Sequence, residues 1–186
     1  MTAHYFIGIK VEKSIRTKLT EWQNVLAKSM NYKDWTSEED FHITLKFLGG
    51  CSDKTIDVYK NKLMNEEWPG AFRIAIGPAG YFGNPKQPRV FYADAEKPKE
   101  LEVIKLEVEK IGSELGFQTE GRTYRPHVTL AKKNAEGMSP LALESYDLLL
   151  DESYSMLIDH FSIFRIHPQQ NPKYEAIAHI SLNKEE

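Results

Sequence analysis

The residues best suited to do chemistry form a short motif that occurs twice. Residues 42–45 read His-Ile-Thr-Leu and residues 127–130 read His-Val-Thr-Leu, each inside a run of β-prone residues. Side chains on a strand alternate between its two faces, so each histidine projects beside its threonine while the apolar residues project into a core. Two such strands related by an approximate twofold axis would place two imidazoles and two hydroxyls around one small cleft.

Two imidazoles and two hydroxyls suit the cleavage of a phosphodiester. An imidazole titrates near pH ~6.5, so one ring can be neutral and act as general base while the other is protonated and acts as general acid. The hydroxyls can donate hydrogen bonds to phosphate oxygens that gain charge in the transition state. A strained cyclic phosphate fits best, because it needs no metal for activation. The residues alone leave His42 and His127 interchangeable as acid and base.

Three basic residues near the motifs are candidate contacts to a substrate, each weighed against the alternative of a solvated surface charge. Alternation places Lys46 on the same face as the first histidine and threonine. Arg125 precedes a proline, which favours an extended backbone from which its side chain could reach a nucleic acid. Alternation directs Lys132 away from the second histidine, so we expect it to reach a phosphate only if its strand contains a bulge.

The composition is typical of a soluble globular protein and excludes several classes. The 186 residues are 41% hydrophobic, and the net charge of −3 argues against a cationic coat for nucleic acid while allowing a local basic pocket. The single cysteine, Cys51, excludes an intramolecular disulfide and a cysteine-rich zinc site. No apolar run is long enough for a membrane span, and the first residues lack a signal-peptide pattern, so we expect a cytoplasmic protein.

The elements that must position the motifs follow from hydrophobic spacing. Strands are expected at residues 5–11, 41–48, 72–76, 89–95, 126–132, 156–167 and 174–182. Helices are expected at residues 14–30 and 98–115 and, between them, from Ser52 or Asp53 to a point before Pro69. Residues 77–85 read as a turn-rich connection, and residues 141–150 fit neither pattern. This mixture predicts an α+β fold, which we expect to form a single domain over residues 1–186.

The two motifs with their flanks resemble the signature of a known superfamily. Residues 42–49 (HITLKFLG) and 125–132 (RPHVTLAK) are similar to the paired motifs of the 2H phosphoesterases, and most similar to the bacterial and archaeal RNA 2′,3′-cyclic phosphodiesterases, also called 2′-5′ RNA ligase-like or LigT-like proteins. The resemblance covers nearly the whole chain, including Trp35 and residues 80–83 and 88–90. One departure is Lys132, where the family often has an arginine; lysine lacks the bidentate fork of arginine.

The resemblance implies a bilobal fold, with two pseudo-symmetric antiparallel sheets, helices packed outside and a central cleft. It implies hydrolysis of RNA 2′,3′-cyclic phosphate ends, or of small cyclic nucleotides, to 2′-phosphates without a metal or a cofactor. It assigns His42 as proton donor to the leaving oxygen and His127 as proton acceptor from water. Thr44 and Thr129 would hold the phosphate oxygens. We expect the protein to act as a monomer.

Three other hypotheses remain open at this point. The chain could be a related 2H enzyme that acts on small cyclic phosphates or joins RNA through 2′-5′ linkages. It could instead be a non-catalytic module that binds RNA ends, with both histidines serving only as hydrogen-bond donors. A metal site built on the two histidines is the least favoured, because no third ligand follows at a recognisable spacing.

Overall fold

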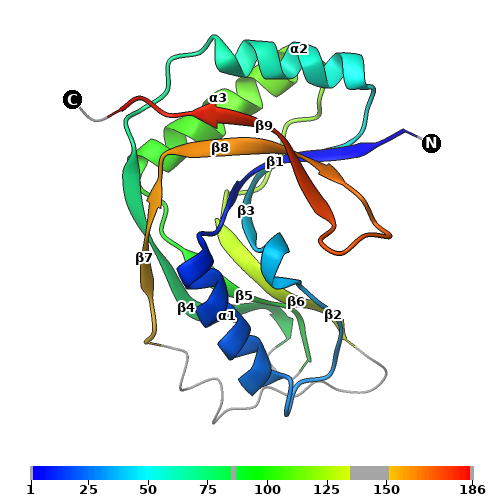
Figure 1. Cartoon of the computed structure of the whole chain (residues 1–186), viewed down its shortest axis with the longest axis vertical. Coiled ribbons are helices and arrows are strands. Elements are labelled where there is room, and N and C mark those ends of the chain that lie inside the picture. The colour runs from blue at the N-terminus through cyan, green and yellow to red at the C-terminus, as the bar shows by residue number, and fades with distance from the viewer. Residues whose placement is uncertain (1, 85–86, 135–150, 185–186) are drawn as a thin grey trace.

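The computed structural model describes residues 2–84, 87–134 and 151–184 and has an α+β fold built on one antiparallel sheet (Figure 1). Its strands are β1 His4–Lys10, β2 Tyr32–Trp35, β3 His42–Gly50, β4 Phe72–Asn84, β5 Gln87–Ala95, β6 His127–Asn134, β7 Tyr154–Ile158, β8 His160–Ile166 and β9 Tyr174–Ser181. Its helices are α1 Lys13–Leu26, α2 Asp53–Met64 and α3 Lys99–Glu114, with a 3-10 turn η1 at Glu38–Asp40. The predicted fold class is confirmed.

The sheet consists of two halves that meet at the two motifs. Its strand order is β7-β4-β5-β6-β3-β1-β8-β9, with β2 added to β6. Within the described residues, β3 and β6 share one pair of Cα partners, Ile43 and Val128, which are the middle residues of the two motifs. The β6 half (β7, β4, β5 and β6) and the β3 half (β3, β1, β8 and β9) therefore lie on either side of a junction that brings both histidine–threonine doublets together.

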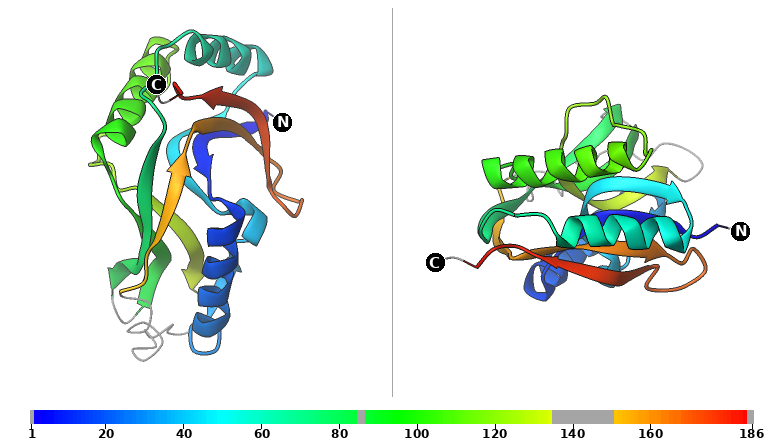
Figure 2. Two further views of the ribbon diagram at one scale, coloured as in Figure 1. Left: turned by 60° about the vertical axis from the view of Figure 1, so that its left-hand side comes forward. Right: turned by 90° about the horizontal axis from the view of Figure 1, so that it is seen from above.

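Each helix covers the sheet with one apolar stripe. The buried residues of α1 include Ile15, Leu19, Trp22 and Leu26, and those of α3 include Leu101, Ile104, Val108 and Ile111, at the three- and four-residue spacing of a helix face. Helix α2 begins after Ser52, whose hydroxyl accepts a hydrogen bond from the Thr55 N–H. Figures 1 and 2 show α2 and α3 at the end of the molecule that carries β9, and α1 at the opposite end beside β2.

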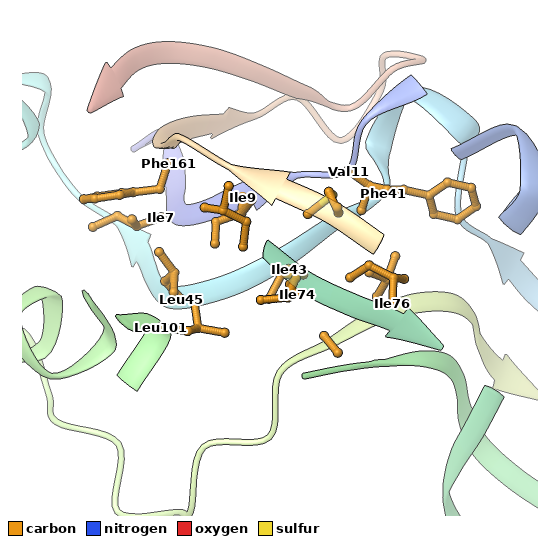
Figure 3. Close-up of a cluster of buried hydrophobic side chains, with 14 of the residues drawn as sticks. Ile7, Ile9, Val11, Phe41, Ile43, Leu45, Ile74, Ile76, Leu101 and Phe161 are labelled. Carbon is orange, nitrogen blue, oxygen red and sulfur yellow. The ribbon is translucent and has the colours of Figure 1, made fainter. Parts of the chain in front are cut away.

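The apolar residues of the motifs anchor a core shared by both halves. Ile43, Leu45, Val128 and Leu130 are almost completely buried, as the alternation predicts. Figure 3 shows Ile43 and Leu45 of β3 in one cluster with Ile74 and Ile76 of β4. Because these apolar side chains point into the core, the histidines and threonines of both motifs point from the opposite face of their strands, away from this core.

The strand predictions differ from the structure at three places. Most of the connection expected at residues 77–85 is instead a continuation of β4, which runs to Asn84. Residues 77 and 78 lie at an irregularity in its pairing with β5, between Ile76 and Ala79. Gly77 has a φ of 108°, and a Cβ there would lie 2.2 Å from the Glu152 carbonyl oxygen, so this position requires glycine. The expected strand at 156–167 is two strands separated at Asp159, and β2 was not predicted. Residues 141–150 lie outside the described residues.

Candidate active site

Both motif strands contain a β-bulge directly after the threonine. In the pairing of β3 with β1, the register passes from Thr44 to Lys46 and leaves Leu45 without a partner. In the pairing of β6 with β5, it passes from Thr129 to Ala131 and leaves Leu130 without a partner. An extra residue shifts the alternation by one, so the side chains beyond each bulge change faces.

The bulge in β3 turns Lys46 into the interior. Its side chain is 2% exposed and forms an ion pair with Glu109 at 2.8 Å. Its ammonium also donates a hydrogen bond of 2.8 Å to the Gln118 carbonyl. The prediction that Lys46 shares a face with His42 is therefore wrong, because simple alternation does not survive the bulge at Leu45. Lys46 holds the fold together and is not a candidate phosphate contact.

The bulge in β6 has the opposite effect on Lys132 and brings it to the functional face. Lys132 lines the same pocket as His42, and its side chain is 43% exposed. In the other half, Phe47 occupies the corresponding place, five residues after its histidine, and lines the same pocket. At corresponding positions, the second motif therefore contributes a cation and the first an aromatic ring to the central pocket. This difference makes the two ends of an otherwise symmetric site unequal.

The two histidine rings are held in the same orientation. The Nδ1 of His42 donates a hydrogen bond of 2.7 Å to the Asp40 carbonyl, and the Nδ1 of His127 donates one of 2.7 Å to the Arg125 carbonyl. A carbonyl can only accept, so each Nδ1 carries the proton and each Nε2 is left to exchange protons with a substrate. The Nε2 of His42 lies 3.0 Å from the hydroxyl oxygen of Thr44.

The residues of the two doublets line two pockets. The central pocket, of about 220 Å³, is lined by Phe6, Thr36, His42, Thr44, Phe47, Thr129, Lys132, Ile166 and Tyr174. The His127 pocket, of about 340 Å³, is lined by Phe82, Tyr92, Asp94, Lys97, Thr123, Tyr124, Arg125, Pro126 and His127. Thr129 lines the central pocket although it belongs to the second motif, because the antiparallel pairing of Ile43 with Val128 places Thr129 next to His42. Arg125 lies at the His127 pocket, where it can meet a substrate.

Aromatic rings pack around each histidine. The ring centroids of Phe6 and Tyr174 lie 4.5 and 5.0 Å from that of His42. Those of Phe82 and Tyr92 lie 5.1 and 5.2 Å from that of His127. Such packing limits rotation of the imidazoles and provides flat apolar walls next to them. Phe6, Tyr174 and Tyr92 could not be recognised as site residues from the sequence, because nothing in their local patterns separates them from core aromatics.

Asp40 joins two parts of the site. It is 4% exposed, and its carboxylate oxygens accept hydrogen bonds of 2.9 and 3.1 Å from the backbone N–H groups of Lys173 and Tyr174. Its backbone carbonyl accepts the hydrogen bond from His42 Nδ1. The turn between β8 and β9 is thereby tied to the first histidine. The sequence signal for Asp40 is its position, two residues before a motif histidine, which Arg125 also occupies.

The electrostatic setting of His42 favours its neutral form when no anion is present. The pKa of His42 is lowered to about 4, chiefly by burial; the hydrogen bond to the Asp40 carbonyl and the Asp40 charge oppose this shift, and positive charge on His127 and Lys132 adds to it. A phosphate in the central pocket would replace this repulsion by attraction and raise the pKa. The cleft is thus arranged so that His42 gains its proton as an anion binds.

We therefore expect sulfate, which does not itself titrate in this range, to bind more tightly as the pH falls from 8 towards 5. If His42 takes up the proton that accompanies binding, the affinity for sulfate rises by up to about tenfold for each pH unit below the pKa that His42 has in the complex. Calorimetry at several pH values measures this, and the His42→Asn variant is the control. An unchanged pH dependence in that variant would place the linked proton elsewhere, His127 being the alternative.

No group of three or more His, Cys, Asp or Glu side chains in the described part of the chain is arranged to hold a metal ion. No helix among those residues is long and apolar enough to cross a membrane.

Comparisons with known proteins agree with this geometry. Residues 9–92 match the family described as LigT like phosphoesterase. The RNA 2′,3′-cyclic phosphodiesterase of Bacillus subtilis is 33% identical over 189 residues, which cover 97% of each chain. The protein of the same name from Geobacillus stearothermophilus is 27% identical over 97% of this chain, which spans 57% of that protein's length.

Solved structures share the fold over almost the entire chain. Escherichia coli LigT complexed with 3′-AMP superposes with a TM-score of 0.78, at 17% identity, over 99% of this chain and 100% of that one. TT0787 of Thermus thermophilus superposes with a TM-score of 0.77, at 20% identity, over 98% and 100%. The paired histidine motifs, the shared fold and the extent of identity to the Bacillus protein show that this chain belongs to the LigT-like phosphoesterases of the 2H superfamily.

Proposed function

We propose that this protein hydrolyses 2′,3′-cyclic phosphate ends of RNA to 2′-phosphate ends by acid–base catalysis between two histidines. The observation that carries the proposal is the matched pair of imidazoles. Each donates a hydrogen bond from its Nδ1 to a backbone carbonyl, which leaves its Nε2 for proton transfer. The names of the related proteins support this substrate. Cyclic phosphate ends also suit the chemistry, because ring strain lowers the barrier that the two histidines must overcome.

In the proposed reaction, water attacks phosphorus in line with the bond to the ribose 3′ oxygen. The Nε2 of His127 takes a proton from the water, the new P–O bond forms and the P–O3′ bond breaks. The Nε2 of His42 gives its proton to the departing 3′ oxygen. His127 ends protonated and His42 neutral, so exchange of protons with solvent restores both for the next cycle.

The direction of proton transfer rests on the family resemblance, and the local charges are compatible with it. His42 is neutral in the empty cleft, so its role as acid requires a proton that arrives with the anionic substrate. Thr44, Thr129 and Lys132 line the central pocket, where the two hydroxyls would donate to the non-bridging oxygens and the lysine would supply a positive charge. Arg125, at the His127 pocket, is a further candidate contact.

One chain supplies both motifs, so a single copy holds a complete set of these groups. We therefore propose that the enzyme works as a monomer. The single cysteine is compatible with a reducing compartment such as the cytoplasm.

The test is incubation of the full chain with a short oligonucleotide that ends in a 2′,3′-cyclic phosphate, with and without EDTA. Equal turnover in both, and a product that co-migrates with the authentic 2′-phosphate standard, is the expected result. A 3′-phosphate product, or turnover that EDTA abolishes, would contradict the proposal. Tight binding without conversion would identify a module that only binds RNA ends.

A further inference from the structure

A third pocket adjoins the central pocket, and its lining has no residue in common with that of the His127 pocket. This lateral pocket, of about 210 Å³, is lined by Asp34, Trp35, Thr36, Ser37, Asp40, Lys132, Asn171, Lys173 and Tyr174. Thr36, Lys132 and Tyr174 line both pockets, so the two hollows share a wall. None of the reaction steps above uses the lateral pocket.

Two ammonium groups at the lateral pocket share one carboxylate as their ionic partner among the described residues. Lys132 lies 3.9 Å and Lys173 lies 3.6 Å from opposite oxygens of one carboxylate, that of Asp34. Both distances exceed a hydrogen bond, and both lysine side chains are more than 40% exposed, at 43% and 41%. An ammonium has three donors, so each lysine retains donors for an additional anion.

The other carboxylate of the pocket is already occupied. The two oxygens of Asp40 accept the backbone N–H groups of Lys173 and Tyr174, which directs this carboxylate at the backbone. These hydrogen bonds also fix the main chain from which the Lys173 side chain extends. Hydroxyls of Thr36 and Ser37 and the flat surface of Trp35 complete a lining suited to a phosphate and its sugar.

The direction of the bound RNA follows from the proposed function, on which this inference rests. His42 protonates the 3′ oxygen that leaves, so the ribose of the last nucleotide lies on the His42 side of the scissile phosphate. The rest of the chain leaves that ribose through its 5′ oxygen and continues away from His127. The lateral pocket shares lining residues with the central pocket and none with the His127 pocket, and its Asp34 and Trp35 pair with Lys132 and Ala131, on the far side of Thr129 from His127 along β6.

We propose that the lateral pocket binds the phosphate that links the last two nucleotides of the RNA, with Lys173 as its principal contact. Lys132, which lines both pockets, lies between this phosphate and the cyclic one. The enzyme is therefore built for oligonucleotides, and a nucleoside 2′,3′-cyclic monophosphate occupies only part of its site.

The test compares two substrates in the full-length protein: a trinucleotide that ends in a 2′,3′-cyclic phosphate and the corresponding nucleoside 2′,3′-cyclic monophosphate. Lys173→Ala is expected to raise KM for the trinucleotide about five- to tenfold at low salt and to leave the mononucleotide unchanged. It should also reduce the slope of log(kcat/KM) against log[salt] for the trinucleotide by about 0.7, the loss of one phosphate contact on a single strand. Asp34→Asn removes the competing carboxylate and should lower the same KM.

The control is Lys110→Ala, which removes an exposed lysine of α3 that lines none of the three pockets. It changes the net charge as Lys173→Ala does and should alter neither substrate. An equal effect of Lys173→Ala on both substrates, or on neither, would overturn the subsite. If the wild-type protein hydrolyses both substrates with the same KM, the subsite is refuted and the proposed function stands. If it turns over neither substrate, both the proposed function and the subsite are refuted.

Discussion

Replacement of either His42 or His127 by alanine is expected to lower kcat for cyclic phosphate hydrolysis by roughly 10²- to 10⁴-fold, the usual contribution of a positioned acid or base. Each ring supplies one of the two proton transfers, and neither belongs to the buried apolar core. The expected loss is therefore in kcat, with the fold retained. Steady-state rates and the unfolding midpoint of each variant measure the two effects separately.

His160→Ala is the matched control. His160 lies on β8 beside Asp159, lines none of the pockets of the cleft and is 46% exposed through its side chain. Its removal should leave kcat unchanged. Because both catalytic rings act in one transition state, the double variant should be little slower than the slower single variant. Hydrolysis that persists near the wild-type rate in both single variants would end the assignment.

Glu109→Ala is expected to lower the free energy of unfolding by about 3–5 kcal/mol, the cost of breaking a buried ion pair and leaving the Lys46 charge without its partner, while Lys105 keeps its pair with Glu120. Glu109 binds two buried ammonium groups, of Lys46 at 2.8 Å and of Lys105 at 2.9 Å. The Lys105 ammonium also donates a hydrogen bond of 2.6 Å to the carbonyl of Leu45, the bulged residue that follows Thr44. The network therefore holds α3 against the strand that carries the first motif.

The charge state of this network gives its contribution a definite pH dependence. Burial alone would raise the pKa of Glu109, but the ammonium groups of Lys105 and Lys46 outweigh it and hold that pKa below its ordinary value. A carboxyl whose pKa is lowered in the folded state stabilises the protein above the unfolded value of ~4.3, and this stabilisation is lost as the pH falls through the folded value. The destabilisation caused by Glu109→Ala should accordingly shrink in acid.

Urea unfolding at neutral pH measures the effect, with Glu114→Ala as the control. Glu114 forms an exposed pair with Lys62 at 3.2 Å, and its loss should cost less than ~1 kcal/mol. Equal destabilisation by the two variants would show that burial of the network contributes nothing. Glu109→Gln keeps the shape but loses the charge, and should fall between the wild type and the alanine variant.

The sequence was sufficient to predict the features that depend on local patterns. The repeated histidine–threonine doublet, the burial of Ile43 and Val128 between them, and the apolar stripes of α1 and α3 all follow from residue spacing. The same information predicted that α2 begins at Ser52 or Asp53, and the structure has Ser52 as the cap. These features require only the periodicity of one element, which the chain itself carries.

The features that depend on pairing between distant strands could not be predicted. Alternation assigned Lys46 to the cleft, but the bulge at Leu45 arises from the register of β3 against β1 and reverses its direction. The same effect in β6 brought Lys132 into the site. In the sequence, Lys105 and Glu109 are charged residues within an expected helix, and nothing there marks them as buried. Their burial results from the packing of α3 on β3. The link from Asp40 to the β8–β9 turn joins segments that are remote in sequence.

The central claim is that two imidazoles act on one phosphate. The most direct test is to follow the Nε2 signals of His42 and His127 by ¹⁵N NMR while inorganic phosphate is added. We predict that both signals move along one binding curve, and that either histidine's replacement by asparagine weakens binding at the other. Movement of only one signal, or two curves with different dissociation constants, would contradict the account.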